Sequence, residues 1–357
     1  MEADETPPDA ELTAAVKAVA LELGFVRAGV ARAGCLDAEG ERLRAWLAAG
    51  KHGEMAWMER TADVRINPRD ERMLAGAESV LVLATPYARD PERVGPAPGR
   101  VARYARGRDY HNVLGKRLEK LTRWLRERGH GARGSVDSMP VFERAWAQRA
   151  GLGFIGKNSC LIIPGLGSHV FLSAVVTTAR LVPDTPMRER CGACTLCLDG
   201  CPTSAFDGAR ELDARKCISY LTIEHEGRID EALRPAVGDW IFGCDVCQDV
   251  CPYNRTELPP PSVTAPFAPS TRWDAHDAES ILEMSDHAFG VYSEGSPVRR
   301  TGRDGMARNA AVVLGNRGER CHLPVLDNAA RTHLSPVVRE TAAWAARTLR
   351  ERLDEQK

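Results

Sequence analysis

The stretch CGACTLCLDGCP, from Cys191 to Pro202, decides how this chain is organised. Successive cysteines stand three, three and four positions apart, and a proline follows the last one. The spacing C-x2-C-x2-C-x3-C-P is typical of three thiolates around one 4Fe–4S cluster and a fourth thiolate that binds a second cluster. A second cysteine run is therefore expected elsewhere in the chain.

That second run is Cys244, Cys247 and Cys251, followed again by proline. It is one ligand short, because Ile241 stands where a first cysteine would be. Cys217 is the other cysteine between the two runs, so it supplies the missing thiolate. We predict one cluster on Cys191, Cys194, Cys197 and Cys251, and the other on Cys201, Cys217, Cys244 and Cys247.

Zinc is the alternative occupant, since zinc sites also use C-x2-C pairs. Zinc gives no reason for three cysteines at successive three-residue steps, or for the prolines that end both runs. Two adjacent 4Fe–4S clusters form an electron relay and perform no organic chemistry themselves. Another part of the chain must receive the electrons.

Composition points to a cytosolic protein. The chain has 357 residues, a net charge of −1 and ordinary globular content, with no apolar run long enough for a membrane span and no visible export signal. Eleven cysteines in a reducing compartment argue for metal binding rather than disulfides. We expect a cytoplasmic monomer that does not bind membranes.

Strands alternate with helices through about Leu181, which favours an α/β layer. Cysteine, proline and glycine then dominate the sequence, and clear helical periodicity returns near the C-terminus. We predict a multi-domain α+β and α/β protein. Its expected parts are an α/β catalytic domain (1–181), a ferredoxin-type domain for the two clusters (182–258), a proline-rich linker (259–273) and a helical HEAT-like domain (274–357).

Several motifs occur in one order along nearly the whole chain. Asp137 precedes PVFER and AGLGFIGKN, and the cysteine runs follow, with CISYLTIEHEG and GRDGMARNAAVVLGN after the first run. In this combination the chain closely resembles the epoxyqueuosine reductases. The resemblance implies that the N-terminal domain is of nitroreductase-like or reductive-dehalogenase-like type and binds cobalamin.

The resemblance also implies the reaction. Family members complete queuosine in the anticodon wobble nucleotide of tRNA by converting an epoxide on its cyclopentane ring into an alkene. Two electrons and two protons enter, and one water leaves. The implied cofactors are base-off cob(II)alamin and the two 4Fe–4S clusters, and the implied partners are tRNA bearing epoxyqueuosine and an external low-potential electron donor.

By resemblance, Asp137 is the acid that protonates the departing epoxide oxygen, although an aspartate here could equally cap a turn. Ser219, Tyr220 and Thr222 lie beside Cys217, so they are expected where substrate meets cofactor. Tyr220 could also be a core residue. The other residues assigned to the cobalamin pocket are Arg60, Tyr104, Tyr110, His111, Lys157 and Asn158.

A basic stretch is the candidate tRNA contact. The stretch from Arg299 to Arg320 contains six arginines and two acidic residues. Such a basic stretch on a helical unit can follow a phosphate backbone. The same pattern also occurs on ordinary solvated helix faces. The residues assigned to the substrate are Tyr220, Arg299, Arg300, Arg303, Arg308 and Asn309.

Two rival functions remain open. A reductive dehalogenase would use the same cofactors on a small organohalide, but the basic helical C-terminal region would then lack a purpose. A non-catalytic iron–sulfur electron carrier or RNA-binding protein would need no long α/β domain ahead of the clusters. Absorption after anaerobic reconstitution with cobalamin separates these alternatives, because a carrier would retain iron alone.

Overall fold

The computed structural model describes residues 7–87, 99–255, 260–270 and 276–355. The helices are α1 (Ala10–Glu22), α2 (Asp37–Ala48), α3 (Ala56–Arg60), α4 (Ala62–Ile66), α5 (Glu71–Leu74), α6 (Tyr110–Arg126), α7 (Glu143–Arg149), α8 (Leu196–Asp199), α9 (Ile218–Ile223), α10 (Arg234–Val237), α11 (Val246–Asp249), α12 (Pro261–Thr264), α13 (Ala278–Leu282), α14 (Asp286–Tyr292), α15 (Gly302–Arg317), α16 (Leu323–Thr332) and α17 (Pro336–Glu355). The strands are β1 (Arg27–Arg32), β2 (Ser79–Pro86), β3 (Arg100–Val101), β4 (Ala132–Ser135), β5 (Phe154–Ile155), β6 (Leu161–Ile162), β7 (Val170–Thr177), β8 (Phe206–Gly208), β9 (Glu211–Leu212) and β10 (Trp240–Phe242).

A four-stranded sheet of order β1-β2-β7-β4 organises the N-terminal part. Every residue of β2 is buried, as expected of a central strand between two covered faces. All three ladders are antiparallel, so the sheet differs from the parallel one that an α/β pattern favours. The helices between the strands cover the two faces and do not serve as parallel crossovers.

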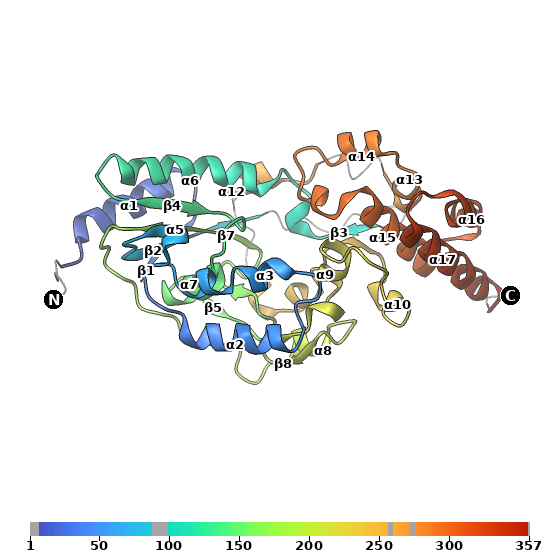
Figure 1. Cartoon of the computed structure of the whole chain (residues 1–357), viewed down its shortest axis with the longest axis horizontal. Coiled ribbons are helices and arrows are strands. Elements are labelled where there is room, and N and C mark those ends of the chain that lie inside the picture. The colour runs from blue at the N-terminus through green and yellow to red at the C-terminus, as the bar shows by residue number, and fades with distance from the viewer. Residues whose placement is uncertain (1–6, 88–98, 256–259, 271–275, 356–357) are drawn as a thin grey trace.

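Helices pack on both faces of this sheet (Figure 1). On one face, Leu114 and Leu121 of α6 join Val175 of β7 in an apolar core that also takes in α1. On the other face, Trp146 of α7 packs with Val80 of β2 in a second core. The sheet thus holds α6 and α7 in fixed positions, and the segment joining β4 to α7 carries Asp137.

The cysteine-rich region and the C-terminal helices share one hydrophobic core. Ile218 and Trp240 of the former pack in one cluster with Met306 and Leu349 of the latter. Strand β10 also pairs in parallel with β3, which belongs to the N-terminal part of the chain. The predicted boundaries therefore do not separate independent cores.

The segment expected as a linker is partly structured. Residues 259 and 271–273 lie outside the described residues, whereas α12 and a short 3-10 helix (Ala265–Phe267) lie within them. Phe267 is buried, and its ring lies 4.9 Å from that of Phe171 in β7. This part of the segment is therefore docked on the sheet core. Within the described ranges, no helix is both long and apolar enough to cross a membrane.

Candidate iron–sulfur and catalytic site

The first predicted cysteine set surrounds one cavity. A cavity of about 50 Å³ is lined by all four members, Cys191, Cys194, Cys197 and Cys251, together with Leu196 and Tyr253. Cys251 is buried in a small apolar cluster with Phe154 and Ile162. Four thiols around one small cavity have the donor chemistry of a 4Fe–4S site. We call this group the outer set.

The second predicted set, called the inner set, also gathers in space. Burial, and secondarily the charges of Cys217, Asp245 and Cys201, raise the pKa of the Cys244 thiol to about 12. Burial likewise raises the pKa of Cys217, while the backbone N–H groups of Tyr220 and Ser219, in the first turn of α9, lower it. Such N–H groups stabilise sulfur that carries negative charge, and they tune cluster potentials.

Ligand spacing is compatible with clusters. In the ranges that the structure describes, no three His, Cys, Asp or Glu side chains form a group able to hold a single metal ion. A 4Fe–4S cluster stands between its four thiolates, so its ligands lie farther apart than those of one ion. Iron analysis distinguishes a cluster from zinc directly.

Asp137 lies beside Tyr110, at the start of α6. The Tyr110 hydroxyl donates to Asp137 Oδ2 over 2.8 Å. The Tyr110 ring stacks between Phe171 and His111, at centroid distances of 4.5 and 4.1 Å. Asp137 itself is exposed and has a φ of 54°, in the left-handed region that aspartate and asparagine tolerate better than most residues. The carboxyl is thus accessible and oriented by a buried phenol.

His111 carries its own carboxylate partner. Its Nδ1 lies 2.8 Å from Asp109 Oδ1, and this hydrogen bond raises the pKa of His111. Asp109, and to a smaller degree the charge of Asp137, thus favour the protonated form of His111.

Aromatic rings lead from Asp137 toward the inner set. Tyr104 lies edge-on to Tyr110 at 6.1 Å, and its ring is 6.2 Å from that of Phe242. Phe242 ends β10, two residues before Cys244. Burial raises the pKa of both Tyr104 and Tyr110, so their hydroxyls stay protonated. The predicted residues Asp137, Tyr104, Tyr110 and His111 are thus brought together next to the inner set.

Glu143 is a functional candidate that the sequence did not reveal. It opens α7, where an acid usually only complements the helix dipole. Here burial, and secondarily the charge of Asp137, raises the pKa of Glu143 from 4.5 to about 7. Burial lowers the pKa of the nearby Arg65 guanidinium. The negative charges of Glu143 and Asp137 act in the opposite direction but are smaller effects. Glu143 is therefore a half-buried proton-holding group close to Asp137.

We expect Glu143→Gln to change how stability depends on pH. Because the folded state holds the Glu143 proton up to about pH 7 and the unfolded chain releases it near pH 4.5, stability falls as pH rises through that window. The wild type should lose on the order of 2–3 kcal/mol more unfolding free energy between pH 5 and pH 8 than the variant. Urea denaturation at both pH values measures this, and equal losses in the two proteins would contradict it.

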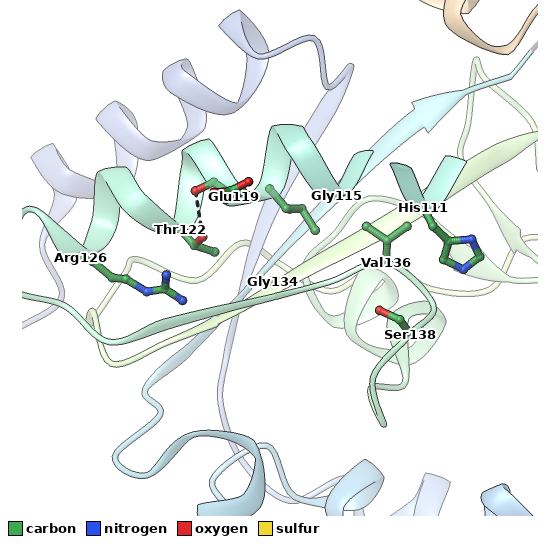
Figure 2. Close-up of a pocket in the computed structure, with 9 residues that line it drawn as sticks. His111, Gly115, Glu119, Thr122, Arg126, Gly134, Val136 and Ser138 are labelled. Atoms are coloured by element: carbon green, nitrogen blue, oxygen red, sulfur yellow. Dashed lines mark hydrogen bonds between the residues drawn. The ribbon is translucent and has the colours of Figure 1, made fainter. Parts of the chain in front are cut away.

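A groove adjoins the loop that carries Asp137. Its volume is about 310 Å³, and it runs between α6 and β4. Figure 2 shows that His111 lies at one end of the groove and Arg126 at the other, with Val136 and Ser138 on the loop. The residues on either side of Asp137 thus line an open groove.

The predicted tRNA arginines divide into two groups. Arg299 and Arg300 are exposed, in a 3-10 helix (Pro297–Thr301). Arg300 Nη2 lies 2.9 Å from Glu224 Oε2; that bond raises the pKa of Arg300, as do the charges of Asp137 and Tyr110 to a smaller degree. Arg303 is largely buried and is paired with Asp286 and Asp304.

The assignment of Arg308 and Asn309 to substrate is wrong. Both are buried, at 1% and 0% exposure, in the core of α15. Arg308 donates to the carbonyls of Leu221, His225 and Gly227. Asn309 donates to those of Thr222 and Ile241. The two side chains fasten the helical region to α9 and β10 by satisfying carbonyls that would otherwise be buried without partners.

Four more residues that we assigned to the cofactor or the substrate have structural roles: Thr222, Tyr220, Lys157 and Asn158. Thr222 is fully buried; its hydroxyl donates to Ile218 O and accepts from Gly243 N. Tyr220 is buried, and its hydroxyl accepts from Glu54 N. These two side chains are therefore not free to contact a cofactor or substrate.

Lys157 and Asn158 hold the cysteine loops. Lys157 Nζ donates to Gly192 O over 2.7 Å, and Asn158 Nδ2 donates to Cys247 O over 3.1 Å. Asn158 Oδ1 also accepts from Cys160 N. The two side chains link the stretch AGLGFIGKN to both cysteine sets. We expected them at the edge of the cobalamin instead. Ser219 is half-buried beside Cys217, and Arg60 is exposed at the end of α3.

Fold and site together define an iron–sulfur oxidoreductase, in which a double-cluster module joins an α/β sheet domain that presents an acid near the inner set. A family model described as "4Fe-4S double cluster binding domain" matches residues 190–254, and one described as "Epoxyqueuosine reductase QueG, DUF1730" matches residues 65–138. The chain belongs to the epoxyqueuosine reductase family. The resemblance seen in the sequence motifs is confirmed.

Curated relatives cover most of both chains. An epoxyqueuosine reductase of Gloeobacter violaceus is 43% identical over 318 residues, covering 87% of this chain and 98% of the relative. The enzyme of Escherichia coli is 38% identical over 344 residues, covering 94% and 89%.

Solved structures agree with this. An epoxyqueuosine reductase crystallised with an epoxyqueuosine-modified tRNA-Tyr stem loop aligns with a TM-score of 0.86 and 30% identity, covering 95% of this chain and 90% of that one. The Bacillus subtilis enzyme, with its catalytic loop swung out of the active site, aligns with a TM-score of 0.85 and 29% identity, covering 95% and 90%. A reductive dehalogenase aligns at a TM-score of 0.43, too low to extend the likeness to that family.

Proposed function

We propose that this chain reduces epoxyqueuosine in tRNA to queuosine, with electrons that pass from the outer cysteine set through the inner set. The observation that carries the proposal is the placement of an exposed acid, Asp137, at the end of an aromatic path from the inner set. The structural neighbour bound to an epoxyqueuosine-modified stem loop supports the same substrate here.

The outer set would ligate one 4Fe–4S cluster and the inner set the other. The shared cavity of the outer set and the mutual electrostatic influence of Cys201, Cys217 and Cys244 support this division. Cys247 belongs with the inner set, because its pKa is raised by the neighbouring Cys160, by burial and by Cys217 and Cys244.

The resemblance further assigns cobalamin to the space near Asp137. Tyr104, Tyr110 and His111 fit the surroundings of a large flat cofactor, since they present aromatic rings between Asp137 and the inner set. When bound, cobalamin supplies a low-potential cobalt able to reduce the epoxide carbon. The structural contacts of Thr222 and Asn158 speak against the direct cobalamin contacts expected of them.

Asp137 would deliver the proton that the leaving oxygen requires. The epoxide loses both C–O bonds, and its oxygen leaves as water after taking up two protons while two electrons enter. The Tyr110 hydroxyl holds the Asp137 side chain in place during this transfer. Glu143 and His111, two protonatable groups nearby, are candidates for resupplying the proton.

Anaerobic turnover on tRNA bearing epoxyqueuosine tests the proposed function. Enzyme reconstituted with iron, sulfide and cobalamin is reduced with dithionite, and nucleosides from the digested tRNA are read by mass spectrometry. Loss of epoxyqueuosine with gain of queuosine is expected. An electron carrier without catalytic function would retain iron and leave the nucleoside unchanged. A tRNA-modifying enzyme of this kind would work as a monomer in the cytoplasm, supplied by an external donor.

We expect Arg299→Ala combined with Arg300→Ala to weaken tRNA binding and to flatten its dependence on salt. Each lost phosphate contact lowers the slope of log affinity against log salt by about one, so loss of Arg299 should lower it by about one and loss of Arg300, which already pairs with Glu224, by less. Fluorescence anisotropy of a labelled anticodon stem loop at several salt concentrations measures the slope.

Two controls sharpen that test. Arg303→Ala should change the slope less, because Asp286 and Asp304 already neutralise Arg303. Arg347→Ala removes an exposed charge on α17, paired with Glu231, and should leave the slope unchanged. An unaltered slope in the double variant would show that Arg299 and Arg300 only face solvent.

A further inference from the structure

The two cysteine sets differ in their access to solvent. Residues 192–196 are all exposed, Cys194 included, and Leu196 is 47% exposed. In the inner set, Cys217 precedes α9, whose Ile218 and Leu221 are buried in the core shared with the C-terminal helices. An external electron donor therefore meets the outer set first.

The surface around the outer set is basic. Arg188 and Arg190 are exposed immediately before Cys191, and Arg255 is exposed after the second run. Within the described part of the chain, none of these three arginines forms an ion pair. Lys157 adds a fourth cation, with its Nζ on Gly192 O of the same loop.

The local carboxylates are fewer and already hydrogen-bonded. Glu189 Oε1 accepts from Cys191 N over 2.6 Å, and Asp199 Oδ2 accepts from the Thr195 hydroxyl over 2.7 Å. Tyr253, which lines the cavity of the outer set, donates to Arg190 O and so fixes that arginine's backbone beside the cysteines. Three of the four cations thus lie on the segments that carry the outer set, and the exposed Leu196 lines the same cavity as the fourth, Lys157.

We propose that this surface docks a small acidic protein that carries one electron at a time. The proposal rests on the proposed function, in which the outer set receives the electrons. We call the surface the donor face and define it by Lys157, Arg188, Arg190, Leu196 and Arg255. Opposite charges speed association, and redox encounters use small, transient interfaces with an apolar centre. Each encounter oxidises the carrier by one electron and reduces the outer cluster by one, so two encounters serve one epoxide.

The donor face lies away from the proposed tRNA site. In Figure 1, α8, which begins at Leu196, lies at the lower edge of the molecule, whereas α6 and α14 lie along the upper edge. Asp137 is bonded to Tyr110 at the start of α6, and Arg303 near the arginine patch pairs with Asp286 at the start of α14. The donor and tRNA should therefore bind at the same time.

Binding of a small acidic ferredoxin to the cluster-loaded enzyme tests the proposal. Biolayer interferometry at low salt should show the Arg188→Glu and Arg190→Glu double variant binding about tenfold more weakly than wild type, with a flatter salt dependence. Reduction of the clusters by the ferredoxin, followed as loss of visible absorbance without tRNA, should slow about tenfold. Reduction by dithionite should change less than about twofold, because a small reductant needs no docking face.

A matched control reverses two lysines elsewhere. Lys116→Glu with Lys120→Glu changes the same charge on exposed positions of α6, and ferredoxin binding should stay as in wild type. Equal ferredoxin affinity and equal cluster reduction in the Arg188/Arg190 variant and wild type would overturn the donor face, as would competition between ferredoxin and tRNA. Failure of dithionite-reduced wild type to convert epoxyqueuosine would reject the proposed function instead, while the cluster-reduction assay would still score the docking.

Discussion

Asp137→Asn should lower the single-turnover rate of epoxide reduction by about a hundredfold or more while leaving the protein folded and loaded. General acid catalysis contributes roughly two to four orders of magnitude, and an amide cannot deliver a proton. In this structure the substitution should remove the acidic proton of the side chain and change little else. Asparagine tolerates the left-handed φ of 54° as well as aspartate does, and its amide oxygen can still accept from the Tyr110 hydroxyl.

Pre-reduced enzyme and substrate tRNA, mixed anaerobically and quenched over time, give the rate. Ser138→Ala is the matched control, since it changes the next residue of the same exposed loop without removing a proton donor. Iron content and stem-loop affinity should stay at wild-type values in both variants. If Asp137 only capped a turn, asparagine would serve equally, so near-normal turnover would remove it from the mechanism and direct attention to His111 and Glu143.

The local sequence pattern predicts those parts of the fold that depend only on residues close together in the chain. Helix α1 follows its N-cap Asp9, whose side chain accepts from Leu12 N, and ends shortly before Gly24 at φ 91°, so both of its ends are set by residues within a few positions of them. The antiparallel pairing of β2 with β7 was not predictable in the same way. These strands lie far apart in sequence, and two buried apolar runs fit parallel or antiparallel partners equally well.

Burial explains the misassigned site residues. Arg308 and Asn309 look like surface residues by type, yet α15 is buried without a break from Met306 to Gly315. A helix that is apolar on every side belongs in a core, and MARNAAVVLG carries that signal apart from these two side chains. Glu143 is the reverse case. Its type and position are ordinary, and only the packing around α7 gives it an unusual proton affinity.

The cysteine spacing, by contrast, predicts the ligands in the two runs without any knowledge of the fold, because cluster ligation ties residue type to fixed intervals, and Cys217 is assigned because it is the cysteine left between the runs. What spacing could not provide is the direction of the relay. The exposure of Cys194 and Leu196, set against the aromatic path from the inner set to Asp137, orders the sites from solvent to substrate. Electron entry and proton delivery thus fall on different sides of the module.

Cys217→Ala should remove about four of the roughly eight iron atoms expected for two 4Fe–4S clusters and should abolish epoxide reduction. Cys217 stands before α9, with the backbone N–H groups of Ser219 and Tyr220 directed at its sulfur and with Cys201 close by. Alanine leaves the inner cluster with three thiolates, while the outer set keeps all four. Anaerobic reconstitution, followed by iron and sulfide analysis and by electron paramagnetic resonance of the reduced protein, should show one cluster in place of two.

The remaining cysteines supply the controls. Cys35→Ala and Cys321→Ala, both at exposed positions, should keep about eight irons. Cys160 is the informative case, because its thiol is hydrogen-bonded to Cys247 and could take over as a ligand. If Cys217→Ala kept eight irons and lost four only when combined with Cys160→Ala, Cys160 would be a replacement ligand. If both variants kept eight, Cys217 would not be a ligand, and the crossed assignment of the two cysteine runs would be wrong.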